Sequence, residues 1–147
     1  MFETIVVGTD GSETADEAVR QATALARTCG DRTRIHLVTA YKPLESMVVA
    51  PEVVPSGLAG LVDPRAEARV VADEAADKIR AEGVDVETYV WPGDAASAII
   101  DVAISAKADV VVVGSRGMSG AARFLLGSVP NRVSHHAPCT VLIVRTC

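Results

Sequence analysis

The chain has 147 residues, the length of one domain, and 49% of them are hydrophobic although only 3% are aromatic. The formal net charge of -5 argues against a general nucleic-acid binder, because such proteins carry a basic face. We find no apolar run long enough for a membrane span and no basic segment followed by a signal core. We therefore expect a cytoplasmic protein with a single domain over residues 1–147.

The spacing of apolar residues predicts strands and helices in alternation. A short apolar run at 4–8 predicts the first strand, and Ser12, with acidic residues after it, predicts a helix that ends at Gly30. The second strand is predicted at 34–40. The segment 41–63 holds three prolines and two glycines among apolar residues, so we expect a functional or mobile connection there.

The second half of the chain continues the same alternation. Apolar residues at helical spacing predict a second helix, which ends at Gly83. Polar and apolar residues then alternate, which is typical of a less buried edge strand, and the third helix begins near Asp94. The remaining predicted elements are a strand at 109–113, a short helix near 128–136 and a last strand at 139–144. This order implies an α/β fold, with a parallel sheet, helices on both faces and right-handed crossovers.

A glycine-rich loop follows the strand at 109–113. The motif Gly-x2-Gly-x9-Gly-Ser begins at Gly114, continues at Gly117 and ends with Gly127 and Ser128. Glycines let backbone N–H groups approach a phosphate closely, and a helix N-terminus adds unpaired N–H groups and a positive partial charge. The loop therefore predicts a phosphate site, with Ser128 as the helix cap and as a phosphate ligand.

This loop, the run Val6–Ser12 and the closing strand Cys139–Val144 together resemble the nucleotide-binding subgroup of the universal stress protein family. The resemblance covers nearly the whole chain. It implies a single doubly wound, Rossmann-like sheet of five parallel strands in the order 3-2-1-4-5. It also implies an adenine nucleotide as ligand, of the ATP, AMP or cyclic AMP class, with Mg²⁺ as a candidate companion.

Ligands of such sheets lie at the carboxyl ends of the strands, where the strand order reverses. The residues that we predict to bind the nucleotide come from the ends of three strands and from the loop. They are Gly8, Thr9 and Asp10, then Val38 and Ala40, and finally Val113, Gly114, Arg116, Gly117, Gly127, Ser128 and Val129.

Several of these residues allow two interpretations. Asp10 either opens an Asx-turn into the first helix or contacts a ribose hydroxyl or a divalent ion. Arg116 is either solvated or folded over a phosphate. The resemblance alone implies that backbone groups near Ala40 form hydrogen bonds with the edge of the adenine. His135 and His136 are adjacent on a helix and point apart, so we predict no metal site there.

Two residues depart from the family pattern. Pro130 lacks the N–H that nucleotide-binding members more often have at this position, which removes a candidate phosphate donor. Gly8 stands where proline is common. We therefore expect a nucleotide with one phosphate to bind at least as tightly as ATP.

The sequence contains no catalytic motif and no phosphate-loop lysine. The leading interpretation is a sensor, regulator or reservoir of an adenine nucleotide in a stress response. The alternatives are a slow ATP hydrolase of the same fold and an interaction protein that binds no nucleotide. The apolar last strand, Val141–Val144, predicts a two-fold homodimer, because an exposed apolar edge favours pairing with a second copy.

Overall fold

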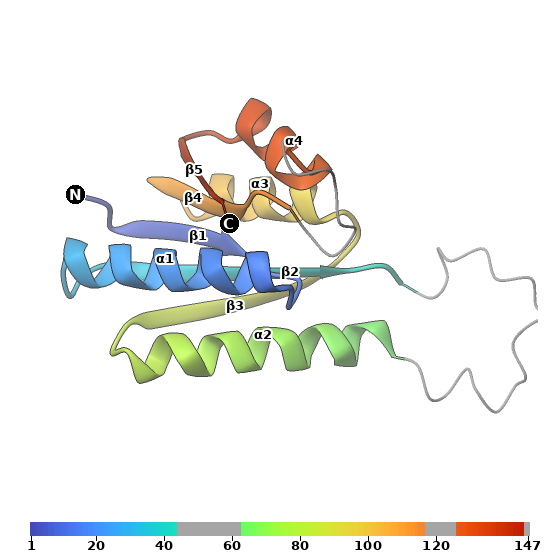
Figure 1. The fold of residues 1–147 in the computed structure, drawn as a ribbon, viewed down its shortest axis with the longest axis horizontal. Coiled ribbons are helices and arrows are strands. Elements are labelled where there is room, and N and C mark those ends of the chain that lie inside the picture. Colours follow the sequence, from blue (N-terminus) through green and yellow to red (C-terminus); the bar gives the residue numbers. More distant parts are fainter. Residues whose placement is uncertain (44–62, 117–125, 146–147) are drawn as a thin grey trace, which may run out of the picture.

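The computed structural model describes residues 1–43, 63–116 and 126–145 of the chain. Most of the expected functional or mobile connection at 41–63 lies outside these residues. Strands and helices alternate in the order that the sequence predicts (Figure 1). They are β1 (Thr4–Gly8), α1 (Glu13–Cys29), β2 (Arg34–Tyr41), α2 (Pro64–Ala81), β3 (Asp85–Pro92), α3 (Ala95–Ser105), β4 (Val110–Gly114), α4 (Ser128–His136) and β5 (Thr140–Val144).

The five strands form one parallel sheet in the order β3-β2-β1-β4-β5. The fold class and the strand order that the sequence predicts are both confirmed. The centre of the sheet is β1, which pairs with β2 on one side and with β4 on the other. The chain thus builds the sheet outward from β1 in one direction and then in the other, and the strand order reverses between β1 and β4.

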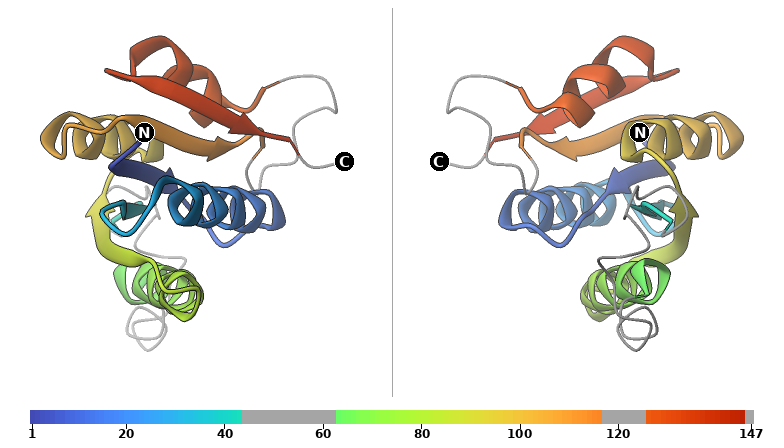
Figure 2. Two further views of the ribbon diagram at one scale, coloured as in Figure 1. Left: turned by 90° about the vertical axis from the view of Figure 1, so that its left-hand side faces the viewer. Right: turned by 90° about the vertical axis from the view of Figure 1, so that its right-hand side faces the viewer.

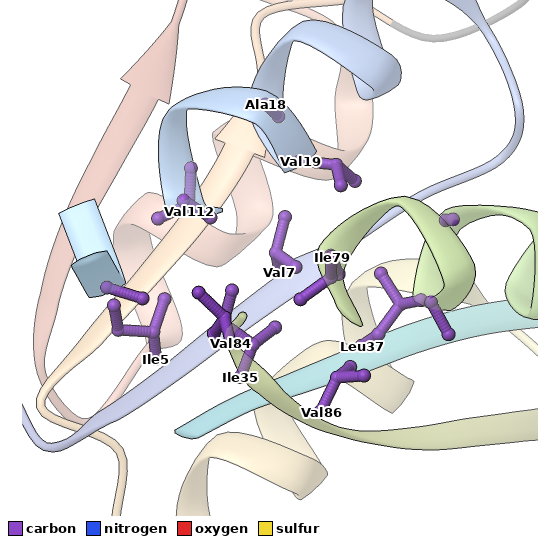
Figure 3. Packing of buried hydrophobic residues seen from close by; sticks show 14 of the residues in the cluster. Ile5, Val7, Ala18, Val19, Ile35, Leu37, Ile79, Val84, Val86 and Val112 are labelled. Atoms are coloured by element: carbon purple, nitrogen blue, oxygen red, sulfur yellow. The ribbon is translucent and has the colours of Figure 1, made fainter. Parts of the chain in front are cut away.

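Helices cover both faces of the sheet, with α1 and α2 on one face and α3 and α4 on the other (Figure 2). Successive residues of a strand point to opposite faces, so Ile5 and Val7 join the cluster under α1 and α2, whereas Val6 joins the cluster under α3. Figure 3 shows Val7, Leu37 and Ile79 meeting within the first cluster. Because both faces are buried, the central strands are continuously apolar.

The starts of the long helices follow from short polar side chains. Ser12 caps α1, and its Oγ accepts a hydrogen bond from the N–H of Ala15 at 3.3 Å. Asp94 caps α3 by accepting from the N–H of Ser97 at 2.9 Å. Gly30 ends α1 with a φ of 121°, a backbone conformation that favours glycine. The helix boundaries predicted at these residues are therefore confirmed.

The range of α4 matches the helix predicted near 128–136, but its cap does not match the prediction. Its cap is Gly127 and not Ser128, and no side chain makes a capping hydrogen bond there. The carbonyl of Gly127 accepts from the N–H of Asn131 at 3.2 Å, so Ser128 is already the first helical residue. The prediction of Ser128 as the cap is wrong, because Gly127 has the extended backbone of a cap whereas Ser128 is already helical.

Candidate functional site

A pocket lies at the carboxyl ends of β1, β2 and β4, between the N-terminal ends of α3 and α4. This is the place where the strand order reverses, and it is the usual ligand site of an open α/β sheet. Its volume is about 80 Å³ as bounded by the described residues. The predicted site residues that line it are Gly8, Thr9, Asp10, Val38, Ala40, Val113, Gly114, Arg116 and Val129.

Four lining residues are absent from the set that we predict to bind the nucleotide: Ala15, Ala95, Ile99 and Pro130. Three of them lie on α1 and α3, where only tertiary packing brings them to the strand ends. The remaining predicted residues are near the pocket or outside the description. Gly127 and Ser128 lie at the start of α4 beside the lining residue Val129, and Gly117 is outside the described residues.

The turn after β1 is held by its own hydrogen bonds. The N–H of Thr9 donates to the carbonyl of Val38 at 2.9 Å, and Thr9 Oγ1 accepts from the N–H of Gly11 at 3.2 Å. Asp10 Oδ1 accepts from the N–H of Ser12 at 2.9 Å, which is the Asx-turn that we give as one reading of Asp10. The carboxylate thus shapes the turn and lies at the pocket edge, where a ligand contact is compatible with the turn.

Gly8 and Gly114 lie at strand ends, and each leaves room for a different neighbouring residue. A Cβ at Gly114 would lie only 2.9 Å from the carbonyl oxygen of Thr14, so α1 requires glycine at this position. The sequence predicts that this glycine lets the backbone approach a phosphate, and the structure adds a packing role against α1. A Cβ at Gly8 would instead lie 2.5 Å from Cδ1 of Ile99, on the α3 face of the sheet.

Both ends of the glycine loop are fixed to the sheet. The N–H of Ser115 donates to the carbonyl of Val144 at 2.8 Å, and the N–H of Gly127 donates to the carbonyl of Ser115 at 2.9 Å. These bonds hold the start of α4 beside the end of β4. The N–H groups of Ser128 and Val129 have no acceptor within the helix, because they belong to its first turn. An anion at the pocket would meet these N–H groups and the positive end of the helix dipole.

A polar cluster joins α3 to α4 beside the pocket. The guanidinium of Arg132 donates to Asp94 Oδ2 through Nη1 and to Ser97 Oγ through Nη2, the latter at 3.1 Å. Burial raises the pKa of the Asp94 carboxyl, but the hydrogen bonds from Ser97 and Arg132 outweigh it and hold that pKa below its usual value. The cluster lies next to the lining residues Ala95 and Pro130. Asp94 and Arg132 are far apart in the chain, and no sequence pattern indicates that they pair, so the sequence does not predict this cluster.

A second hollow, of about 600 Å³, lies between α1 and α2. It is larger, and its lining mixes the acidic side chains Glu13, Asp16, Glu17 and Glu82 with the basic side chains Arg20, Arg27 and Lys78. Glu17 pairs with Arg20 and Glu82 with Arg27, so much of this charge is already neutralised within the protein. Its lining contains no glycine and does not include the start of α3 or α4. We therefore place the candidate nucleotide site at the strand ends.

Within residues 1–43, 63–116 and 126–145, no group of three or more His, Cys, Asp or Glu side chains is placed to hold a metal ion. The rings of His135 and His136 are 6.4 Å apart and tilted by 56°. Over the same part of the chain, no helix has the length and hydropathy needed to cross a membrane.

The chain is similar to known proteins over nearly its whole length. The sequence profile of the universal stress protein family matches residues 1–145. A universal stress protein of Thermus aquaticus is 33% identical over 151 positions, which cover 99% of this chain and 100% of the relative. A universal stress protein solved in complex with cAMP is 33% identical, with 99% of this chain and 98% of that chain covered and a TM-score of 0.71. The structure of the protein MJ0577 is 24% identical and has a TM-score of 0.82, and the match covers 100% of this chain and 98% of that chain. It shows that the two proteins share a fold.

Proposed function

Since the chain belongs to the universal stress protein family, we propose that it binds an adenine nucleotide in the pocket at the strand ends. Its role is that of a sensor, regulator or reservoir of that nucleotide in a stress response, and not that of a fast enzyme. The relative solved with cAMP supports this choice of ligand, because it matches this chain over nearly its full length.

The observation that carries the proposal is the convergence of three kinds of group on one pocket. The ends of β1 and β2 supply Asp10 and the small residues Val38 and Ala40, and the start of α4 supplies backbone N–H groups. A flat base fits beside small side chains, a ribose beside a carboxylate, and a phosphate at a helix N-terminus. We assign the adenine, the ribose and the phosphate to these three places in that order.

The start of α4 also bears on the number of phosphates. Ser128 and Val129 offer N–H groups, whereas Pro130, the third helical residue, has none and is buried beside them. This set of donors satisfies one phosphate group and offers little to a second or third. AMP and cyclic AMP are therefore expected to bind at least as tightly as ATP, and Mg²⁺ is a companion of ATP only.

Competition calorimetry with AMP, cyclic AMP, ATP and GMP tests the proposal. We expect the two adenosine monophosphates to bind at least as tightly as ATP, and GMP to bind more weakly than AMP. ATP binding more than about tenfold tighter than the monophosphates would contradict the argument from Pro130. Absence of binding, together with an unchanged melting temperature at millimolar nucleotide, would leave the interaction protein as the correct interpretation. Sustained phosphate release from ATP would favour the slow hydrolase.

We further propose that the protein forms a two-fold homodimer through β5. This strand lies at the edge of the sheet, and Leu142 on it is 41% exposed while Val141 and Val144 are partly exposed. An edge strand with unpaired backbone groups and exposed apolar side chains is a template for a second copy. An antiparallel pairing of two β5 strands would satisfy both features.

A further inference from the structure

The single tryptophan of the chain lies beside the pocket. Trp91 on β3 pairs in register with Ala40 on β2, and Tyr89 pairs with Val38. Ala40 and Val38 both line the pocket. Residues in register on neighbouring parallel strands point to the same face of the sheet, so Trp91 and Tyr89 extend the surface that Ala40 and Val38 form.

Contacts on this face hold the indole in place. The rings of Tyr89 and Trp91 are 5.9 Å apart in a T-shaped arrangement. The hydroxyl of Tyr89 lies 2.8 Å from Nδ1 of His36, which is buried. Both aromatic side chains are partly buried against the apolar cluster that contains Val38 and Ile99. The ring of Trp91 is thus packed against its own strand and the α3 face of the sheet, and part of its surface remains exposed. Trp91 does not itself line the pocket as the described residues bound it, but its register partner Ala40 does.

A partly exposed, fixed indole beside a small-residue floor is a stacking surface. Every nucleobase has a flat face, and aromatic side chains bind it by stacking with little dependence on hydrogen bonding. The two small residues Val38 and Ala40 leave room for a planar ring above the strand ends. We propose that Trp91 contacts the purine of the bound nucleotide and supplies much of the affinity for the base, an inference that rests on the proposed function.

The competing explanation is structural. Trp91 would then only cover the outer part of the α3 face where β3 forms the edge of the sheet. The two explanations differ in what they require of the ligand. If Trp91 stacks on the base, its environment changes when a nucleotide binds and not when a ribose phosphate binds. If Trp91 only covers the sheet, its environment changes with neither ligand.

Intrinsic fluorescence of the wild-type protein distinguishes them, because Trp91 is the only tryptophan. Titration with AMP should quench or shift the emission with the midpoint that calorimetry gives for the same ligand. Ribose 5-phosphate, which lacks the base, should leave the emission unchanged. Emission unaffected by saturating AMP would overturn the role of Trp91, even though binding itself, and with it the proposed function, would stand.

Two variants extend the test. Trp91→Leu should weaken AMP binding by about tenfold, whereas Trp91→Phe, which keeps an aromatic face, should retain most of the affinity. Thermal melting checks that each variant folds, and if Trp91→Leu does not fold, the emission of the wild-type protein decides alone. Equal affinities of folded Trp91→Leu and wild type would contradict the proposal. Absence of AMP binding to the wild type in calorimetry would instead overturn the proposed function and this inference together.

Discussion

The backbone N–H of Gly127 donates to the carbonyl of Ser115 at 2.9 Å and thereby closes the base of the glycine loop. This bond places the first turn of α4 directly beside the end of β4. The pocket at the strand ends depends on it, because the start of α4 forms one wall, while the ends of β1, β2 and β4 and residues of α1 and α3 form the rest.

The two glycines that flank the loop should respond differently to a methyl group. Gly114→Ala would place Cβ 2.9 Å from the carbonyl oxygen of Thr14, a backbone atom that cannot move without shifting α1. We expect this change to lower the free energy of unfolding by about 1–3 kcal/mol. At Gly127 the nearest atom to a Cβ is 3.5 Å away and φ is -62°, so a methyl group has room there. Gly127→Ala should therefore lower the free energy of unfolding by less than Gly114→Ala does, by about 0.5–1 kcal/mol for a less favourable cap residue.

Urea unfolding of the two variants and the wild type measures this difference. Equal stability of Gly114→Ala and Gly127→Ala would show that the contact between β4 and α1 is looser than the structure has it. The comparison also shows that a loss of nucleotide affinity in Gly114→Ala would not by itself locate a phosphate.

The ion pair between Asp94 and Arg132 should couple α3 to α4 weakly. Both side chains are about half exposed, so solvent screens the pair and its contribution should be about 0.2–1 kcal/mol. A double-mutant cycle with Asp94→Asn and Arg132→Gln in urea measures the coupling, and asparagine keeps the capping function of residue 94. The coupling should shrink in high salt. A coupling that salt leaves unchanged would mean that the guanidinium acts through packing and not through charge.

His36 should make the protein less stable in mild acid. Burial lowers the pKa of His36, and the Glu87 carboxylate opposes this only in part. A histidine whose pKa is lower in the folded state than in the unfolded state favours folding fully above its unfolded value of about 6.5. This contribution is lost as the pH falls through the folded-state pKa, because the unfolded chain takes up the proton more readily.

We therefore expect the unfolding free energy to fall between pH 7.5 and pH 5, and His36→Gln to reduce that fall. His135→Gln is the matched control, because the same substitution there replaces an exposed histidine. Urea unfolding of the wild type and the two variants at both pH values gives the three pH differences that are needed. An identical pH dependence in His36→Gln and wild type would contradict the account.

The edge strand β5 should carry the homodimer. Leu142→Glu places a charge on the exposed part of the strand, so the dimer should dissociate at micromolar concentration. Val70→Glu is a suitable control, because Val70 is 55% exposed on α2, on the opposite face of the sheet from α3 and α4. Light scattering gives the mass of each variant. A monomeric wild type, or a dimer that Leu142→Glu leaves intact, would show that β5 is not the interface.

Much of the fold could be predicted because local patterns and the global fold agree. The apolar runs of β1 and β4, the cap at Ser12 and the stop at Gly30 each specify their element without help from distant residues. The strand order was accessible only through the resemblance to a family. The range of α4 was predicted, but its cap was not, because either Gly127 or Ser128 is a favourable cap by type and only the backbone decides between them.

The sequence predicts the site residues that follow directly from the ends of strands. It does not predict those that reach the site only through the packing of helices. Gly8, Asp10 and Ala40 follow from the positions of strands along the chain. Ile99 and the pair of Asp94 with Arg132 depend on how α3 and α4 approach each other, and no local pattern encodes that distance. The packing role of Gly114 was hidden for the same reason, because Thr14 comes close to it only in the folded state.

The most direct test of the central claim removes one backbone donor at the start of α4 without disturbing the helix. Ser128 is the first helical residue, a position that proline favours, and the extended backbone of Gly127 suits a residue before proline. Ser128→Pro deletes the N–H and the hydroxyl, whereas Ser128→Ala deletes the hydroxyl alone. Calorimetry with AMP should show binding to Ser128→Pro at least about fivefold weaker than to Ser128→Ala, the loss of about 1 kcal/mol expected for one hydrogen bond to a phosphate. Equal affinity of the two folded variants would contradict the claim that the phosphate lies at the N-terminus of α4.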